Sequence, residues 1–201
     1  MITRRTMLTS GAITGAAALA LNLDEPFGHL SDEERGARGF PNYALQAHDG
    51  RHVHFYDDLM KGRLIMANFM YADCEGICPA MTTNLQKVQE MLGTRVGADV
   101  HMYSFTLRPQ VDTPAMLQYY VRMHTIKPGW TFFTGKPDEM DRLRRKLGFV
   151  DSDPEADRDL STHVGMVLVG NEAIDRWVAC PALARPEAIA TLVNWMGTHT
   201  A

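Results

Sequence analysis

The 201-residue sequence predicts an α/β fold in which helices flank a mixed β-sheet. Three observations lead to this prediction. Strand-like and helix-like patterns alternate through the middle of the chain, hairpin patterns stand on both sides of that region, and an amphipathic helical pattern closes the chain. Such alternation is typical of a sheet whose two faces are covered by helices, and the second hairpin adds antiparallel strands.

The first expected elements are a hairpin and a buried strand. Residues 43–47 and 52–56 read as strands on either side of His48-Asp49-Gly50, and Asp-Gly is a hairpin turn signal. Residues 64–71 (LIMANFMY) are mostly apolar without alternation. A run of this kind predicts a strand that is buried on both faces.

Helix and strand patterns then alternate towards the C-terminus. Residues 79–92 carry an apolar stripe with helical spacing, which predicts a helix that stops at Gly93. The later elements are expected as a strand over 99–107, a helix beginning at 112–114, a strand over 130–134, a helix over 138–147, a hairpin of strands 164–169 and 174–179, and a helix over 187–196. This order is that of a thioredoxin-like domain with an added N-terminal β-hairpin.

The N-terminus has the pattern of an export signal. Residues 1–23 contain Arg4-Arg5, an Ala/Gly-rich apolar run and Ala18-Leu19-Ala20, which fits the small-residue pattern of a cleavage site. Residues 3–8 (TRRTML) resemble a twin-arginine signal, and the alternatives are an ordinary Sec signal or a retained anchor. We therefore expect a periplasmic protein, in a compartment where disulfides persist.

The rest of the chain is expected to form a single folded unit. Residues 24–39 are polar and charged and read as a linker, and residues 40–201 read as one domain. The formal net charge of −4 and the lack of a long basic block argue against nucleic-acid binding. Membrane contact is expected only through an uncleaved signal, and three cysteines do not make a disulfide framework.

Two cysteines, Cys74 and Cys78, lie four residues apart at the start of the first long helix (YADCEGICPAM). They could form a disulfide, act as a redox couple, bind a metal or only pack. We expect Cys78 to cap the helix before Pro79, where the helix dipole lowers the pKa of a thiol. Asp73 and Glu75 act in the opposite direction, because they disfavour another negative charge nearby. The spacing differs from the two-residue gap of thioredoxin-type redox motifs.

His163 is the candidate third ligand if the thiols bind a metal. It directly precedes a strand pattern, and in a thioredoxin-like topology the loop that enters this strand faces the start of the first long helix. Soft thiolates favour Cu(I), imidazole suits copper in either oxidation state, and a Cys₂His set with an open position is also a zinc pattern. The third cysteine, Cys180, is expected to be buried and inert at the far end of the fold.

The segment YADCEGICPAMTTNL resembles the Y-x-x-C-x-x-x-C-P motif of the Sco (SenC) copper chaperones, which are thioredoxin-like proteins that help assemble the copper centre of cytochrome c oxidase. Residues 104–114 (SFTLRPQVDTP) resemble that family's strand and D-P-x-x-D-T-P turn, and the resemblance covers roughly residues 40–197. Asp112 matches the turn aspartate. Arg108 departs from the pattern, because the family usually has an aspartate there.

The resemblance implies that Cys74, Cys78 and His163 are copper ligands. It further implies a periplasmic metallochaperone that delivers copper to a respiratory copper enzyme, with the copper centre of cytochrome c oxidase as first candidate. Its partners would be the copper-accepting subunit of a respiratory oxidase and another copper donor. The alternative is a thiol–disulfide oxidoreductase that keeps the client's cysteines reduced through Cys74 and Cys78. His163 separates the two functions, because dithiol exchange does not need it.

Overall fold

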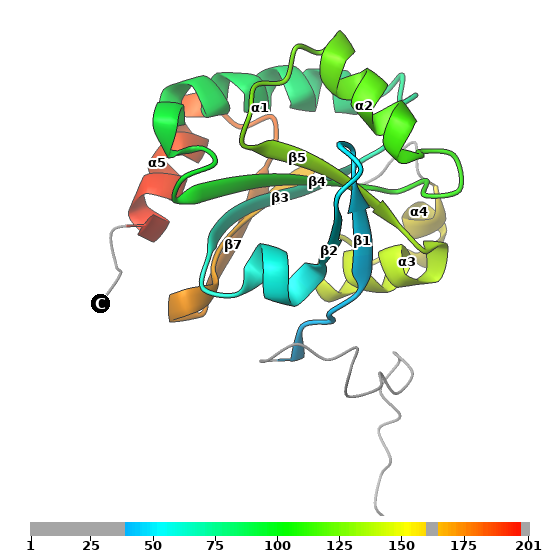
Figure 1. Cartoon of the computed structure of the whole chain (residues 1–201). Coiled ribbons are helices and arrows are strands. Elements are labelled where there is room, and N and C mark those ends of the chain that lie inside the picture. The colour runs from blue at the N-terminus through cyan, green and yellow to red at the C-terminus, as the bar shows by residue number, and fades with distance from the viewer. Residues whose placement is uncertain (1–38, 160–164, 198–201) are drawn as a thin grey trace, which may run out of the picture.

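The structure, a computed structural model, describes residues 39–159 and 165–197. Within them, a seven-stranded sheet has the order β2-β1-β5-β4-β3-β6-β7 (Figure 1). Three parallel strands form its centre and an antiparallel hairpin extends it on each side. The strands are β1 (Ala44–Ala47), β2 (His52–His54), β3 (Leu64–Met70), β4 (Val100–Thr106), β5 (Trp130–Gly135), β6 (Met166–Asn171) and β7 (Arg176–Pro181). The predicted α/β fold with an N-terminal hairpin is confirmed.

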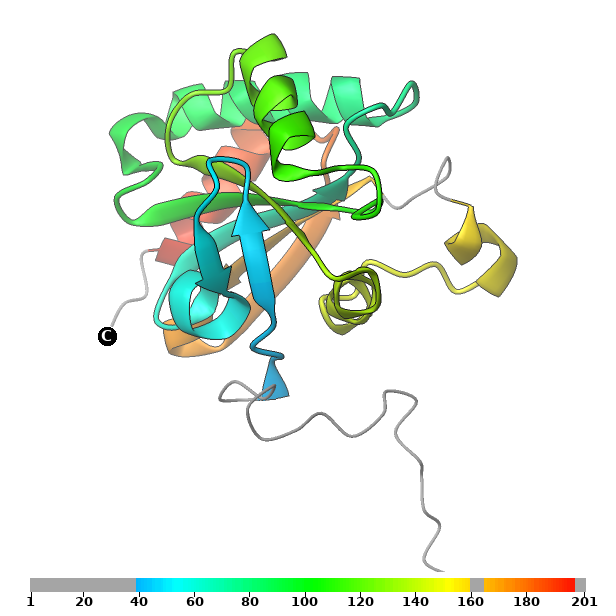
Figure 2. The same cartoon turned by 45° about the vertical axis from the view of Figure 1, so that its right-hand side comes forward.

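Helices cover both faces of this sheet (Figures 1 and 2). One face is covered by α1, α2 and α5, and the other by α3 and the π-helix η3. The helices are η3 (Phe55–Met60), α1 (Cys78–Leu92), α2 (Pro114–Met123), α3 (Pro137–Lys146), α4 (Pro154–Arg158) and α5 (Pro186–Gly197), with single 3₁₀ turns η4 (Gly93–Arg95) and η6 (Glu172–Ile174). No described helix is long and apolar enough to cross a membrane.

Each face of the sheet has its own hydrophobic core, and β3 shows how the sequence builds both. All seven residues of β3 are buried, and its side chains alternate between the two faces. Met66 and Met70 pack in the core beneath α1 and α5, whereas Ile65 and Phe69 pack in the core beside η3 and α3. The continuous apolar run of this strand is therefore explained by burial on both faces.

Helix boundaries follow from local chemistry. The Thr113 side chain accepts a hydrogen bond from the Met116 N–H and caps α2, and Pro114 occupies the first turn, where no backbone donor is needed. Gly93 ends α1 with a φ of 57°, a conformation that costs glycine little. The preceding Asp112 does not cap α2, because its carboxylate binds the Ala72 N–H and the Thr106 hydroxyl instead.

The structure corrects the sequence prediction at two elements. The strand expected over residues 52–56 ends at His54, because Phe55 and Tyr56 are both buried and begin η3. Adjacent residues of a strand point to opposite faces, so a strand at this edge would not bury both. The short helix α4 was not predicted at all. The expected export signal, nearly all of the linker and His163 lie outside the described residues.

Candidate metal centre

Cys74 and Cys78 lie at the end of the sheet where β3 leads into α1. Cys74 belongs to the loop after β3, and Cys78 is the first residue of α1. Both are free thiols, with 8% and 0% of their surfaces exposed, and their side chains are hydrogen-bonded to each other. The structure therefore brings together the two sulfurs that the sequence singled out. Cys78 lies in the core, and Cys74 lies in the loop at the edge of the core.

The loop that carries Cys74 is closed by backbone hydrogen bonds. The Cys74 N–H donates to the Tyr71 carbonyl at 3.3 Å, and the Met81 N–H donates to the Ile77 carbonyl at 2.9 Å in the first turn of α1. Ile77, rather than Cys78, is the N-cap residue. The expectation that Cys78 caps the helix is wrong by one position, and Pro79 still stands in the first turn, as helix geometry favours.

The pKa of the Cys74 thiol is lowered, although burial alone would raise it. Hydrogen bonds from the Cys78 side chain and backbone, the Tyr71 hydroxyl and the Gly76 backbone together outweigh that burial. These donors stabilise a thiolate more than a thiol. The same contact with Cys74 is the largest cause that raises the pKa of Tyr71 to about 12. This role of Tyr71 was not foreseen, although Tyr71 is the first residue of the motif that carries the resemblance.

The pKa of the Cys78 thiol is raised, first by burial and then by its hydrogen bond to Cys74. The prediction that the helix N-terminus favours a Cys78 thiolate is therefore wrong. Desolvation of a fully buried sulfur outweighs the helix dipole here, and the more exposed Cys74 is the sulfur that ionises first. The pair thus consists of one acidic thiol and one thiol that retains its proton.

Asp112 fixes the start of the cysteine loop. Its Oδ2 accepts a hydrogen bond from the Ala72 N–H at 3.2 Å and one from the Thr106 hydroxyl. The side chain is completely buried, and burial raises the pKa of its carboxyl group. Because Thr106 ends β4, this contact ties the loop after β3 to the neighbouring strand. Asp112, which matches the family's turn aspartate, thus has a structural role in this chain.

Arg108 lies beside the same loop and contacts two of its residues. Its Nη1 donates to the Asp73 carboxylate at 2.6 Å, and its guanidinium carbon lies 5.4 Å from the centre of the Tyr71 ring. Cation–π contacts of this kind are weakly attractive at partly exposed sites. The departure from the family pattern therefore places a cation beside the loop that carries Cys74. This cation compensates the negative charge of Asp73, which by itself would oppose ionisation of the thiols.

The segment that carries His163 lies outside the described residues, but its neighbour Gly165 is described. A Cβ atom built on Gly165 would lie 2.3 Å from Ile77 Cδ1 and 3.7 Å from the Met81 sulfur. The entry to β6 is thus packed against the first turn of α1, two residues after His163. Among the described residues, no group of three His, Cys, Asp or Glu side chains could hold a metal.

Cys180 is placed differently from the expectation. It pairs with Val167 near the start of β6, and the Ala182 N–H donates to the Gly165 carbonyl at 2.8 Å. Cys180 therefore lies at the same end of the sheet as the thiol pair, not at the far end of the fold. It is half-buried rather than buried, and burial raises the pKa of its thiol.

Comparison with known proteins gives a consistent result. A model of the SCO1/SenC family matches residues 31–196. The SCO1 protein homolog of Bacillus subtilis (strain 168) is 31% identical over 94 residues, which are 46% of this chain and 47% of that protein. The chain thus matches about half the length of this curated relative.

Solved structures share the fold. ScoI of Bradyrhizobium japonicum with copper bound has a TM-score of 0.62 and 21% identity over 77% of this chain and 96% of its own. BsSco, described as a member of the Sco family of cytochrome c oxidase assembly proteins, has a TM-score of 0.63 and 24% identity over 79% of this chain and 92% of its own. At these identities the likeness shows the thioredoxin-like fold of the Sco proteins.

Proposed function

The chain belongs to the SCO1/SenC family, and we propose that it is a copper chaperone that binds one copper ion through Cys74, Cys78 and His163. The observation that carries the proposal is the hydrogen-bonded pair of buried thiols at the start of α1. Two thiolates are the donor set that Cu(I) prefers, and a neutral imidazole completes a three-coordinate site. Copper bound to the related ScoI supports this choice of metal over zinc.

The residues around the thiols fit a metal that is bound and released. Metal binding requires deprotonated sulfur and therefore displaces protons. The lowered pKa of Cys74 makes the first thiolate accessible, and the charge of the ion would then stabilise the thiolate of Cys78, which holds its proton in the apo protein. The packing of Gly165 against Ile77 supports His163 as the third ligand. Gly165 follows His163 by two positions, and Ile77 directly precedes Cys78.

The place of action and the client form the second part of the proposal. The twin-arginine-like pattern of residues 1–23 supports export to the periplasm. The description of BsSco supports a respiratory oxidase as client. The partners would then be the copper-accepting subunit of that oxidase, with the copper centre of cytochrome c oxidase as first candidate, and another copper donor that loads this chain.

A specific observation also favours thiol–disulfide exchange as a second candidate function. Exchange needs a thiolate that attacks and a thiol that resolves, and Cys74 and Cys78 have pKa shifts in these two directions. The Cys74 thiolate would attack a client disulfide and release one client thiolate. Cys78 would then lose its proton and attack the Cys74 sulfur, which releases the second client thiolate and leaves a Cys74–Cys78 disulfide. The client would gain the two electrons that this pair loses.

The two functions are tested together with purified protein and with strains. Cu(I) titration against a competing chelator should give one equivalent for the wild type and none for a Cys74→Ser/Cys78→Ser variant, with Cys180→Ser as the matched control that keeps full binding. Stoichiometric binding by the double variant would exclude the site. A His163→Ala strain at limiting copper should lose client activity while the purified variant keeps normal dithiol reactivity. Full client activity in that strain would favour thiol–disulfide exchange.

A further inference from the structure

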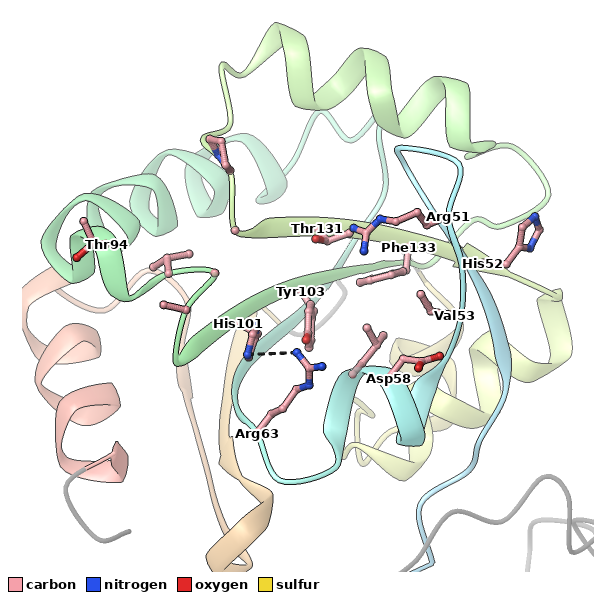
Figure 3. A pocket seen from close by; sticks show the side chains of 16 residues that line it. Arg51, His52, Val53, Asp58, Arg63, Thr94, His101, Tyr103, Thr131 and Phe133 are labelled. Atoms are coloured by element: carbon pink, nitrogen blue, oxygen red, sulfur yellow. Dashed lines mark hydrogen bonds between the residues drawn. The ribbon is translucent and has the colours of Figure 1, made fainter.

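A cavity with a volume of about 830 Å³ opens at the end of the sheet opposite to the thiols. It is bordered by the start of β4, by the β1–β2 hairpin and by the loops that lead into β3, β4 and β5 (Figure 3). β3 and β4 run from this end to the thiol end over seven residues each. At about 3.3 Å per residue, the cavity and the thiols lie roughly 20 Å apart along the strands, so this cavity is separate from the copper site.

Two arginines give the cavity a positive charge. Arg63 forms no ion pair with a carboxylate of residues 39–159 or 165–197, and its Nη1 lies 3.3 Å from the His101 Nε2 (Figure 3). Burial, followed by the charge of Arg63, lowers the pKa of His101. The imidazole is therefore neutral at pH 7 and accepts this hydrogen bond, so the charge of Arg63 is not neutralised by its partner.

Arg51 projects over the same cavity from the β1–β2 hairpin. In Figure 3 its side chain extends from the hairpin towards the other lining residues. Its Nε donates to Asp49 at 2.8 Å, which leaves its terminal nitrogens directed towards the cavity. One carboxylate, that of Asp58, belongs to the lining, and it accepts a 2.6 Å hydrogen bond from the His54 N–H. Arg51 thus forms an exposed ion pair with Asp49 outside the lining, and the lining itself carries two guanidinium groups and one carboxylate that is already hydrogen-bonded.

Neutral donors and an aromatic floor accompany these charges. Tyr103 is 5% exposed, and burial raises the pKa of its hydroxyl to about 12 although Arg63 acts in the opposite direction. The hydroxyl therefore keeps its proton and can donate it. The ring of Tyr103 packs edge-on against Phe133 at 5.6 Å, and both rings line the cavity. A ligand held here would meet donors on one side and aromatic carbon on the other.

The far wall of the cavity is held in place by two glycines. Gly97 and Gly129 both have positive φ values, 91° and 92°, and a Cβ on Gly129 would lie 2.6 Å from the Val96 carbonyl oxygen. Side chains at these positions would force the two loops apart. Glycine therefore allows the loops before β4 and β5 to pack against each other, which preforms the wall and lowers the entropic cost of binding.

We infer that this cavity binds a small organic anion, whose phosphate or carboxylate group is held between Arg51 and Arg63 and whose apolar part rests on Tyr103 and Phe133. Guanidinium groups bind the oxygens of planar carboxylates and tetrahedral phosphates through paired, charge-assisted hydrogen bonds. The volume lies within the range typical of small-molecule sites, about 300–1,000 Å³. A solvated basic surface would not need a buried tyrosine hydroxyl or a wall built on glycines.

Calorimetric titration of the full chain with phenyl phosphate and with benzoate, at constant ionic strength, tests the inference and separates the two anion classes. Saturable one-site binding of at least one probe is expected. Arg51→Gln and Arg63→Gln should each weaken it by about tenfold or more, since each removes a charge-assisted contact. Arg122→Gln removes the same charge from the exposed surface of α2 and should leave the affinity unchanged. The Cys74→Ser/Cys78→Ser variant should also bind the probe normally, because the two sites are separate.

NMR spectra of the backbone amides give an independent readout and show whether each variant is folded. The bound probe should shift the amide signals of Tyr103 and Thr131 but not those of Cys74 and Cys78. Absence of saturable binding for both probes at millimolar concentration would overturn the inference. It would also be overturned if Arg122→Gln weakened binding as much as the two cavity variants, because the interaction would then be unspecific charge attraction. Neither result would affect the copper proposal.

Discussion

The Arg108 guanidinium donates a 2.6 Å hydrogen bond to the Asp73 carboxylate, one residue before Cys74. Arg108 stands where the family usually has an aspartate. Its positive charge compensates the negative charge of Asp73, the residue before Cys74. Side-chain exposures of 35% and 53% for Arg108 and Asp73 mean that solvent screens the pair, so its effect on stability is small. Its effect on the charge near the thiols is the property to measure.

Replacing Arg108 with glutamine should slow alkylation of Cys74 at pH 7 by about two- to fivefold, the range expected for one partly screened charge. Without the guanidinium, the Asp73 carboxylate opposes formation of the thiolate. Arg108→Lys keeps the charge and is the matched control, which should react nearly as the wild type does. The rate is measured with iodoacetamide and mass spectrometry. An unchanged rate in Arg108→Gln would show that Asp73 does not influence the sulfur.

Cys74 should be alkylated before the other two cysteines as the pH is raised. Its pKa is lowered from the usual thiol value near 9.0, whereas those of Cys78 and Cys180 are raised. Below pH 9 a thiol with a lowered pKa has the larger thiolate fraction, and the thiolate is the reactive species. Short pulses of iodoacetamide between pH 6 and 9, followed by peptide mapping, measure the order. Earlier modification of Cys78 or Cys180 would contradict the assignment.

Oxidation should close a Cys74–Cys78 disulfide and leave Cys180 as a free thiol. The side chains of the pair already contact each other, so the bond needs little backbone movement. Cys180 lies at the same end of the sheet, which makes the test more demanding than its sequence position suggested. Mass mapping of the oxidised protein decides it. A peptide that joins Cys180 to either partner would refute the pairing.

Gly165→Ala should destabilise the protein by about 1–2 kcal/mol, as expected for an extra methyl group in a packed contact. The new Cβ would meet Ile77 Cδ1 at 2.3 Å. Ile77→Val removes that carbon, so the double variant should recover much of the loss in a denaturant titration. If His163 is the third ligand, Gly165→Ala should also weaken Cu(II) binding. Equal losses in the single and double variants would mean that the two residues are not coupled.

The sequence was sufficient for the elements whose pattern is strong. β3 is apolar at nearly every position and α1 carries a stripe with helical spacing, so both were predicted within a few residues of their ends. The π-helix η3 and the helix α4 were missed. Burial of both Phe55 and Tyr56 depends on packing beneath the sheet, and α4 is a five-residue helix capped by Asp153, which is too short for a periodic signal.

The proximity of the two thiols was predictable from the sequence, but their electrostatics were not. Cys74 and Cys78 followed from their spacing after a buried strand. The reversal of their pKa order did not, because it depends on which sulfur is more buried and on donors that only the folded loop provides. The contact of Arg108 with Asp73 joins residues 35 positions apart in the sequence, and no local pattern reports such a pair.

X-ray absorption at the copper edge tests the ligand set most directly. The measurement uses Cys180→Ser protein loaded with one equivalent of Cu(II), so that only Cys74 and Cys78 can supply thiolates. We predict two sulfur ligands and at least one imidazole nitrogen, and loss of an imidazole in His163→Ala with both sulfurs retained. A first shell with fewer than two sulfurs, or an unchanged imidazole contribution in His163→Ala, would contradict the proposed copper site.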